Sequence, residues 1–323
     1  MRRVAVLTSG GDAPGMNAAI RAVVRLGLLR GMLVFGIRHG YTGLLAGEFV
    51  PLGARDVGGI VHLGGTMLGT SRCEAFKTEQ GQRQGRDRLR DNDIAALIVI
   101  GGNGSQTGAH ALSQLGMPVI GIASTIDNDL MGTDISIGAT TALDVALESI
   151  DRLRVTARAH ERAFLVEVMG RHCGFLAVSA AIAGGAEAVV VPELAQDPEA
   201  IAGQLRRSRE RGKSHAIVVV AEGARDDADA LAAYFKAHAE RHGLELRVTR
   251  LGHIQRGGAP NAHDRLLATN LGVAAVEQIL AGRDGVLVGW RNGAVVATPL
   301  GEVAHRTKPI DLELLELANS LAL

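Results

Sequence analysis

The sequence predicts an α/β protein of two lobes, each an open, largely parallel sheet flanked by helices. Short apolar, β-branched runs recur along the chain, and most are continuous, as in strands that are buried on both faces. Helix-like stretches lie between these runs, which is the alternation expected of crossover connections. The 323 residues exceed one ordinary domain of roughly 100–200 residues and therefore suggest two lobes.

The apolar runs define the expected strands, and amphipathic stretches define the expected helices. The strands are Arg3–Leu7, Leu33–Ile37, Ala95–Ile100, Pro118–Ala123, Ala163–Val168, Ala186–Val191, Ala216–Ala221 and Gly285–Val288. The helices are Met16–Leu28, Thr140–Arg158, Pro198–Arg211, Ala224–His242 and Ala262–Ala281. Within Thr140–Arg158, apolar residues recur at about the 3.6-residue period of a helix. The polar stretch Glu79–Asp93 is expected to form a solvated helix and loop.

Charge and composition argue against several classes of protein. Lys and Arg total 34, as do Asp and Glu, so the chain lacks the basic excess of a general nucleic-acid binder. Cys73 and Cys173 are too few for a disulfide framework, and the first apolar run is too short for a signal peptide core. The most membrane-like stretch, Cys173–Pro192, is interrupted by glycines and Glu187. We expect two buried elements joined by a turn there, in a cytosolic protein without membrane contacts.

Glycine-rich turns follow two of the expected strands. The first includes Gly10 and Gly11 and precedes the helix at Met16, and the second is Gly101-Gly102-Asn103-Gly104-Ser105. Glycines let backbone amides approach a phosphate, and the N-terminus of a following helix adds a positive dipole end. Either turn alone would also suit a tight βα connection without a ligand. Because ligands of open α/β sheets bind outside the carboxyl ends of the strands, the pair favours a nucleotide or phosphate site.

A polar segment, Ser124-Thr125-Ile126-Asp127-Asn128-Asp129, follows the strand at 118–123. One of its two carboxylates could deprotonate a hydroxyl group, and the other could hold Mg²⁺. Alone, the segment would also suit a solvated Asx turn. After two glycine turns at comparable strand ends, catalytic chemistry is favoured.

Cationic side chains beside glycines or other polar groups form a fourth pattern. They are Arg72, Arg162, Arg171, Arg247, His253 and Arg256. Each one alone would suit a surface position. Guanidinium groups bind phosphate through paired hydrogen bonds, so the set suits an anionic sugar phosphate.

Together these segments resemble the bacterial 6-phosphofructokinases. The matching stretches follow the family's order along nearly the whole chain: LTSGGDAPGMNAAIRAVVR, GGTMLGTSR, IGGNGS, TIDND, GTDISIGATTALD, IDRLR, VEVMGR, AAIAGGAE and LGHIQRGG. The resemblance implies phosphorylation of the carbon-1 hydroxyl of fructose 6-phosphate by ATP with Mg²⁺. It also implies a cytoplasmic homotetramer with active sites shared between subunits, and two discontinuous lobes. The nucleotide-binding lobe would be 1–138 plus 255–305, and the sugar-phosphate-binding lobe 139–254 plus 306–323.

The resemblance also implies roles for individual residues. Asp127 is expected to be the general base, and Thr125 and Arg171 to stabilise the transferring phosphoryl group. The implied nucleotide site is Gly11, Tyr41, Arg72, Cys73, Gly102, Asn103, Gly104 and Ser105. The implied sugar-phosphate site is Thr125, Asp127, Asp129, Arg162, Met169, Gly170, Arg171, Glu222, Arg247, His253 and Arg256. Arg162 and Arg247 would reach a neighbouring subunit's site, and Asn103 and Asp129 would be the metal ligands.

The chain departs from the family's pattern at several positions. Asn103 stands where aspartate is usual, and Ser124 where glycine is usual. The family's effector pocket is matched by Arg21, Arg25, Arg154, Glu187, Arg211 and Lys213. Gly59 and Ser214 replace an acidic residue and a lysine of that pocket, which predicts weakened regulation by ADP or phosphoenolpyruvate.

Two alternative functions remain open at this stage. One is a kinase of the same fold that uses another donor (ADP or pyrophosphate) or another sugar phosphate. Relatives that use pyrophosphate usually carry aspartate at the position of Gly104 and lysine at that of Ser124, so a nucleotide donor is favoured. The other is a weakly active paralogue that senses a sugar phosphate, which Asn103 would favour.

Overall fold

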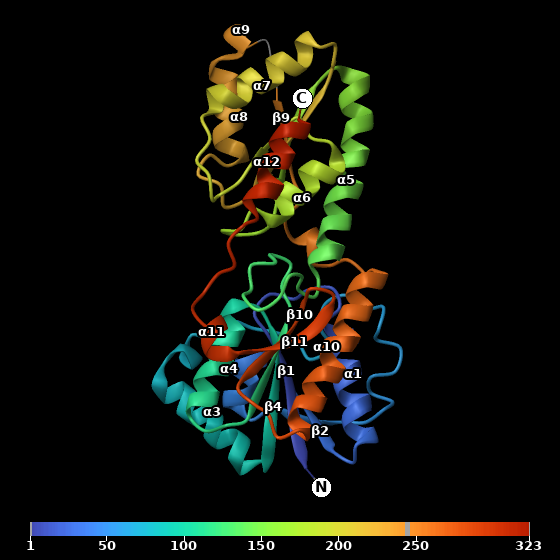
Figure 1. Ribbon diagram of the computed structural model, residues 1–323, viewed down its shortest axis with the longest axis vertical. Helices are drawn as coiled ribbons and strands as arrows, with labels where there is room; N and C mark the ends of the chain where they lie inside the picture. The colour runs from blue at the N-terminus through green and yellow to red at the C-terminus, as the bar shows by residue number, and fades with distance from the viewer. Residues whose placement is uncertain (1, 243–245, 323) are drawn as a thin grey trace. The chain divides into compact units, whose positions relative to one another are not determined.

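The computed structural model describes residues 2–242 and 246–322, and the chain divides into two compact units. Unit 1 comprises Met1–Thr141 and Arg256–Lys308, and unit 2 comprises Ala142–Gln255 and Pro309–Leu323. Each unit is built around its own sheet (Figure 1). The α/β architecture with largely parallel sheets is therefore confirmed.

Unit 1 holds a seven-stranded sheet. Its strands are β1 (Arg3–Ser9), β2 (Leu33–Ile37), β3 (Phe49–Leu52), β4 (Ile94–Gly101), β5 (Val119–Ala123), β10 (Val286–Arg291) and β11 (Ala294–Pro299). The order is β11-β10-β5-β4-β1-β2-β3, with five parallel central strands and an antiparallel strand at each edge. β1, β4 and β5 are almost wholly buried, which explains their continuous apolar sequences.

Helices cover both faces of the unit 1 sheet (Figure 1). One group is α1 (Met16–Leu29) and α10 (Ala262–Leu280), which pack against each other. The other is α2 (Gly40–Ala46), α3 (Glu79–Asp91), α4 (Asn103–Gln114) and α11 (Leu300–Val303), with the short 3₁₀ helix η1 (Ala75–Lys77). Gly272 on α10 lets the first pair approach closely, because an added Cβ would lie 2.8 Å from the carbonyl oxygen of Ala19.

Unit 2 holds a four-stranded parallel sheet. Its strands are β6 (Ala163–Val168), β7 (Ala188–Val190), β8 (Ala216–Ala221) and β9 (Leu246–Arg250), in the order β7-β8-β6-β9. Its helices are α5 (Ala139–His160), which begins in unit 1, α6 (Phe175–Gly184), α7 (Pro198–Glu210), α8 (Ala228–Ala237), α9 (Ala239–His242) and α12 (Leu312–Leu321), with the 3₁₀ helix η2 (Gly252–Gln255). α6 packs on α12, and α7 packs on α8.

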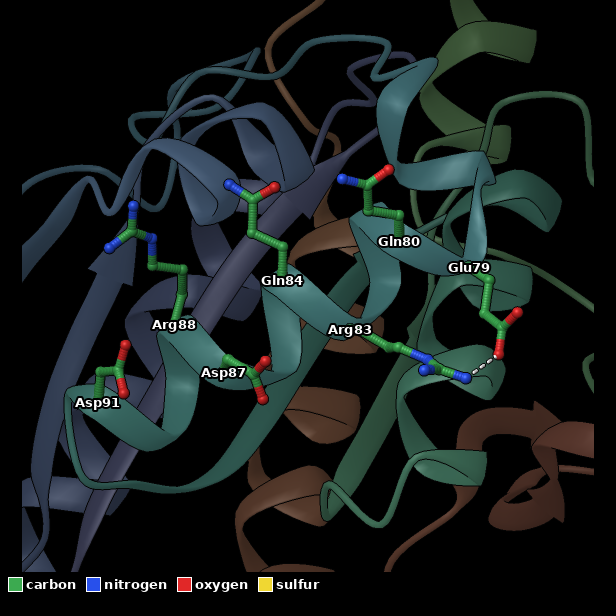
Figure 2. A pocket seen from close by; sticks show the side chains of 7 residues that line it. All are labelled: Glu79, Gln80, Arg83, Gln84, Asp87, Arg88 and Asp91. Atoms are coloured by element: carbon green, nitrogen blue, oxygen red, sulfur yellow. Dashed lines mark hydrogen bonds and ion pairs between the residues drawn. The ribbon is translucent and has the colours of Figure 1, made fainter.

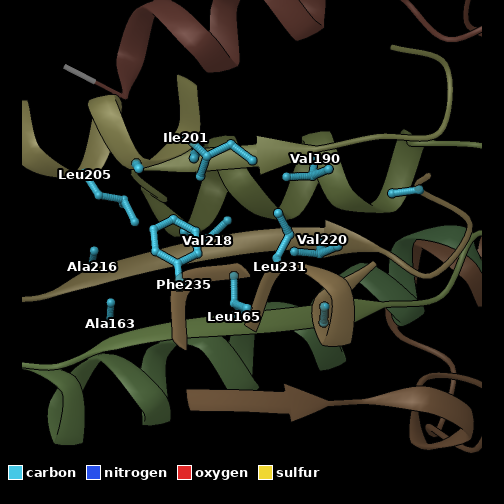
Figure 3. Packing of buried hydrophobic residues seen from close by; sticks show 14 residues of the cluster. Ala163, Leu165, Val190, Ile201, Leu205, Ala216, Val218, Val220, Leu231 and Phe235 are labelled. Carbon is cyan, nitrogen blue, oxygen red and sulfur yellow. The ribbon is translucent and has the colours of Figure 1, made fainter. Parts of the chain in front are cut away.

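The core of unit 2 lies between its sheet and the pair α7 and α8. Figure 3 shows Phe235 of α8 beside Leu205 of α7 and Val218 of β8. Phe235 is only 1% exposed and is among the largest fully buried side chains. Burial of one aromatic ring of this size removes about 150–250 Å² from water, so it contributes strongly to holding both helices on the sheet.

The sequence located the buried strands well, but it missed three edge strands and the helices α2, α4, α11 and α12. All eight expected strands and all five expected helical stretches are present, although Ala224–His242 forms two helices, α8 and α9, instead of one. His238 lies between them, and its ring nitrogen is 2.8 Å from the carbonyl oxygen of Tyr234. The missed strands β3, β9 and β11 are edge strands, which do not need a continuous apolar sequence because one side is solvated.

The stretch Cys173–Pro192 forms α6 and β7, joined by a turn at Gly185, as expected. Across the two described ranges, no helix combines the length and apolar character needed to cross a bilayer.

A polar network ties α7, α8 and α9 together in unit 2. Tyr234 donates a hydrogen bond of 2.8 Å to the Glu199 carboxylate, and Arg206 and Arg241 pair with the other Glu199 oxygen at 3.3 and 3.1 Å. The His242 side chain is fully buried, with its Nδ1 2.7 Å from an Arg206 nitrogen. Burial is the largest cause that lowers the pKa of His242, so the ring is neutral in the folded protein at pH 7.

The buried His242 predicts a loss of stability in acid. Because its folded pKa lies below the ordinary value of about 6.5, the unfolded chain binds the extra proton first. The stabilising contribution is complete above that ordinary pKa and is lost as the pH falls below it. Urea denaturation of the parent and of His242→Gln at pH 7.5 and 5.5 checks this. The variant should lose less stability on acidification, His62→Gln on the surface should behave like the parent, and equal losses in all three would contradict the prediction.

Candidate functional site

The two glycine turns of unit 1 are in direct contact. β1 and β4 are neighbours in the sheet, so their carboxyl ends lie side by side. Gly10 has a φ of 86°, which favours glycine, and its carbonyl accepts a hydrogen bond of 2.7 Å from Thr70. A Cβ on Gly101 would lie 2.6 Å from the Ser9 carbonyl oxygen. The Ser105 hydroxyl occupies that space and donates to the same oxygen at 2.8 Å.

The second turn opens a helix, as phosphate-binding turns do. α4 begins at Asn103 directly after Gly102, so its first backbone amides face outward at the strand end. Tyr41 stabilises this turn, since its hydroxyl donates a hydrogen bond to the Ser105 carbonyl at 2.7 Å. The Tyr41 ring is buried and stacks on Phe76 with centroids 4.0 Å apart, and burial raises its pKa.

The segment with the expected base follows β5, next to the second turn. Thr125 and Asp127 are both buried, at 8% and 5% exposure, and the Asp127 amide donates to the Thr125 hydroxyl at 3.2 Å. Asn128 adopts a left-handed φ of 52° and accepts a 3.0 Å hydrogen bond from the Ser136 amide. The Ser136 hydroxyl donates to the Thr125 carbonyl at 2.6 Å. The segment is therefore an ordered turn rather than a solvated loop.

Asn103, at the start of α4, and Asp129, after the Asp127 turn, are in contact. The Asn103 side-chain amide donates to the Asp129 carbonyl oxygen at 3.2 Å. This orientation leaves Asn103 Oδ1 buried without a hydrogen-bond partner. An amide oxygen in that state suits Mg²⁺, which typically takes one or two protein ligands and completes its shell with phosphate oxygens and water. Within the described ranges, no three His, Cys, Asp or Glu side chains cluster to hold a metal without such help.

Ser124, the departure from the family's glycine, has a structural explanation. Its side chain is fully buried, and its hydroxyl donates to the Ile137 carbonyl at 3.4 Å. The hydroxyl therefore points toward Ile137, the residue that follows Ser136 in the chain.

Arg256 lies against the first glycine turn. Its guanidinium donates to the Asp12 carbonyl at 2.9 Å, and a Cβ added at Gly11 would overlap the same guanidinium. The structure thus brings together one residue from the expected nucleotide set and one from the expected sugar-phosphate set. Arg72 is exposed and Cys73 is half-buried, in the segment before η1.

A second group of expected site residues lies at the carboxyl end of β6 in unit 2. The Met169 amide donates to Gln255 Oε1 at 2.8 Å, and the Arg171 amide donates to the Glu222 carboxylate at 3.0 Å. Gly170 and Arg171 have φ values of 138° and 51°, so this turn is a constrained one. His253 is exposed on η2, which follows β9.

Arg162 and Arg247 lie at the opposite, amino end of the same sheet. Arg162 directly precedes β6, and Arg247 pairs with Phe164 near the start of that strand. Met169 follows five residues after Phe164, or roughly 17 Å at about 3.3 Å per residue. Within one chain these arginines are therefore remote from Met169 and Arg171. Arg162 instead lines a pocket with Arg209 and Lys213.

Part of the expected effector set is assembled in unit 2. The Glu187 carboxylate is buried and accepts hydrogen bonds from the Lys213 ammonium at 3.1 Å and the Ile217 amide at 2.7 Å. Arg154 donates to the carbonyl oxygens of Gly184 and Gly185. Arg211 is exposed at the end of α7, and Arg21 and Arg25 lie on α1 in unit 1.

A shallow groove along α3 holds none of the expected site residues. Figure 2 shows its lining side chains, all polar: Glu79, Gln80, Arg83, Gln84, Asp87, Arg88 and Asp91. They project from one helix, and Arg83 pairs with Glu79. The opposite face of α3 packs on the protein through Gly81 and Gly85, so the groove is a solvated helix face.

Comparison with known proteins identifies the fold and the family. Residues 3–279 match the family model described as Phosphofructokinase. The chain is 53% identical over 325 residues to ATP-dependent 6-phosphofructokinase 1 of Thermus thermophilus, and 48% identical over 323 residues to ATP-dependent 6-phosphofructokinase of Natranaerobius thermophilus. Both alignments cover all of this chain and all of each relative.

Solved structures agree with this result. Phosphofructokinase from Saccharomyces cerevisiae superimposes with a TM-score of 0.85 at 38% identity, covering 99% of this chain and 46% of the yeast chain. This chain therefore spans about half the length of the yeast chain. With a family match over most of its length and relatives near 50% identity over all of it, the chain belongs to the phosphofructokinase family.

Several residues that shape the site were missed by the sequence analysis. They are Ser136, Gln255 and Lys308, all of which act through hydrogen bonds to backbone groups of the expected site segments. Their partners are remote in sequence or lie in irregular backbone, so no periodicity or spacing reveals them. The nearest signal was that Ser136 lies inside the GTDISIGATTALD stretch and Gln255 inside the LGHIQRGG stretch.

The close approach of Arg256 to Gly11 predicts opposite effects for two glycine substitutions. Gly11→Ala should displace the Arg256 guanidinium from the Asp12 carbonyl and destabilise the fold by roughly 1–3 kcal/mol, as for a lost charge-assisted hydrogen bond. Gly104→Ala is the matched control, since its Cβ would meet no atom within 4 Å. It should stabilise α4 by about 0.5–1 kcal/mol through helix propensity. Urea denaturation measures both, and a neutral Gly11→Ala would contradict the prediction.

Proposed function

We propose that this protein is an ATP-dependent 6-phosphofructokinase. It transfers the γ-phosphate of ATP to the 1-hydroxyl of fructose 6-phosphate and releases ADP and fructose 1,6-bisphosphate. The observation that carries the proposal is the buried Asp127 turn, placed beside two phosphate-type glycine turns at neighbouring strand ends. Its support from relatives is 53% identity to the Thermus enzyme along the full chain.

Different residues bind ATP, bind the sugar phosphate, accept the proton and stabilise the phosphoryl group. Unit 1 binds ATP through the two glycine turns, with its phosphates at the N-terminus of α4. Unit 2 binds the sugar phosphate through the Met169–Arg171 turn, Glu222 and His253. Asp127 accepts the proton of the 1-hydroxyl as the sugar oxygen attacks the γ-phosphorus and the bond to ADP breaks. Thr125 and Arg171 donate hydrogen bonds to the phosphoryl oxygens, whose charge is redistributed in the transition state.

We propose Mg²⁺ as the required metal, held by Asn103 Oδ1 and the Asp129 carboxylate together with phosphate oxygens of ATP. When bound, it would neutralise phosphate charge. The buried, unpartnered Asn103 oxygen supports this assignment. An amide contributes no negative charge, so Mg²⁺ should bind more weakly than to an aspartate at the same position.

We propose a cytoplasmic homotetramer in which Arg162 and Arg247 complete the sugar-phosphate site of a neighbouring subunit. Their place at the amino end of the unit 2 sheet, roughly 17 Å or more from Met169 along the strands, supports the idea that they serve a site other than their own.

A coupled assay on one preparation tests the function directly. Its readout is kcat/KM for fructose 6-phosphate with ATP, ADP and pyrophosphate as donors, and ATP should exceed both others. A higher value for ADP or pyrophosphate would make the protein a kinase of the same family with another donor. Tight binding of fructose 6-phosphate without turnover would identify the sensing paralogue instead.

Asp127→Asn should lower kcat by about 10²–10⁴-fold, the usual effect of losing a general base, while both substrates still bind. The amide keeps the shape of the side chain, so folding should be retained. Steady-state kinetics and fructose 6-phosphate titration measure the two effects, and Asp87→Asn on the exposed face of α3 is the control. A rate within a few-fold of the parent would remove Asp127 from this role.

Asn103→Asp should lower the Mg²⁺ concentration that gives half the maximal rate. The substitution adds a negative charge where the buried Asn103 oxygen now lies, and carboxylates bind this cation better than amides. A Mg²⁺ titration at saturating ATP checks the prediction, with the exposed Asn270→Asp as control. An unchanged or higher Mg²⁺ requirement would argue that Asn103 does not contact the metal.

Arg247→Ala should weaken fructose 6-phosphate binding by roughly 10–150-fold, because a charge-assisted hydrogen bond is worth about 1.5–3 kcal/mol. Mixed oligomers of Arg247→Ala and Asp127→Asn subunits should regain activity, since some shared sites then contain both native residues. Verified mixed oligomers without any recovery would show that each site is built from one chain.

A further inference from the structure

The turn that carries Asp127 leads into residues 129–136, which are irregular backbone. Such backbone cannot satisfy its own carbonyl groups, so side chains from other segments must hold it. Asn128 binds the Asp134 carbonyl at 3.1 Å, and Ser136 binds the Thr125 carbonyl at 2.6 Å. The first contact comes from the residue that precedes the segment, and the second joins the end of the segment to the turn that carries Asp127.

Contacts from outside the segment come from Trp290, Asn292 and Lys308. The Asp134 amide donates to the Trp290 carbonyl at 2.7 Å, the Trp290 amide donates to the Thr133 hydroxyl at 2.9 Å, and the Asn292 amide donates to the Asp134 carboxylate at 2.8 Å.

Lys308 supplies a separate set of contacts, to carbonyl groups. Its ammonium donates to the carbonyl oxygens of Thr133 at 3.1 Å and Asp134 at 2.9 Å. Its backbone amide donates to the Asp129 carbonyl at 2.8 Å, and the preceding Thr307 pairs with Leu130 in an antiparallel bridge. One residue, remote in sequence, thus binds the segment at three carbonyl groups.

The Asp129 carbonyl is a shared acceptor. It receives the Lys308 amide at 2.8 Å and the Asn103 side-chain amide at 3.2 Å. The position of Lys308 therefore bears on both the Asp127 turn and the orientation of Asn103. Hydrogen bonds from a charged donor are roughly twice as strong as neutral ones, so the ammonium contacts should contribute strongly to the local order, together with the Trp290 and Asn292 contacts.

We infer that Lys308 is a positioning residue for the phosphoryl-transfer step: its ammonium holds the 129–136 segment so that Asp127 and Asn103 keep their reactive geometry. The inference rests on the proposed function, because it assigns Lys308 to the reaction in which Asp127 is the base. The Lys308 ammonium binds backbone carbonyls of the segment that follows Asp127, so its removal should affect kcat more than substrate affinity.

The test uses the full-length protein with three single variants. Lys308→Met keeps most of the length of the side chain and removes the charge, and Lys308→Arg keeps a cation. Lys236→Met, at an exposed position of α8, is the matched control among the chain's four lysines. Kinetic constants for ATP and fructose 6-phosphate are measured together with hydrogen exchange of peptides that cover residues 124–138.

Lys308→Met should lower kcat by roughly ten- to a hundredfold, the scale expected for a small misplacement of a reacting group, with both KM values within about twofold of the parent. Exchange should rise in residues 129–136 and not in α1 or β8. Lys308→Arg should recover most of the rate, and Lys236→Met should match the parent in every measurement.

A parent-like kcat in Lys308→Met would overturn the inference. A loss of rate would also overturn the inference if protection against hydrogen exchange fell equally throughout the protein, because that result would indicate a general structural role. If Lys308→Met does not fold, Lys308→Gln, which keeps an uncharged donor, decides by the same criteria. Failure of the proposed function is distinguishable, since the parent would then show no turnover of fructose 6-phosphate with ATP, whereas the exchange measurement would still report whether Lys308 orders residues 129–136.

Discussion

The parallel alignment of β1, β4 and β5 is the constraint on which the candidate site depends. Parallel neighbours bring the carboxyl ends of their strands to one edge of the sheet, so the segments that follow them must meet there. The contact between the Ser105 hydroxyl and the Ser9 carbonyl shows how close that meeting is. Glycine at position 101 is needed because any side chain would occupy the space of this hydrogen bond. The phosphate-type turns and the Asp127 turn are thus neighbours because of strand order.

Polar contacts to backbone carbonyl groups, together with the fully buried side chains of Ile126, Leu130 and Ile137, order the loops around this edge. Asn128, Ser136 and Lys308 each satisfy carbonyls that irregular backbone would otherwise leave without partners. Such contacts fix direction as well as distance. They can therefore hold a buried carboxylate such as Asp127 in one geometry, which phosphoryl transfer needs more than it needs covalent chemistry from the protein.

In unit 2, the three arginines expected to bind the sugar phosphate lie at opposite ends of the sheet. Arg171 lies at the carboxyl end with Glu222, whereas Arg162 and Arg247 lie near the amino end. Parallel strands make this separation unavoidable, because residues at opposite ends of one strand cannot approach each other. A sugar phosphate that uses all three arginines would need more than one chain, which gives the proposed shared site a geometric basis.

The sequence by itself determined the buried strands, the two glycine turns and the Asp127 segment that follow three of these strands, and the membership of the family. Continuous apolar runs, the TIDND segment and the glycine turns are local sequence signals. A strand that is buried on both faces must have a continuous apolar sequence. It did not determine the edge strands β3, β9 and β11, whose solvated sides leave no such pattern. Only the tertiary structure decided that Gln255 holds Met169 and that Lys308 holds the segment after Asp127. The physical reason is that these side chains bind backbone carbonyl and amide groups. Nearly every residue has both groups, so the type of the partner residue gives no sequence signal for the contact.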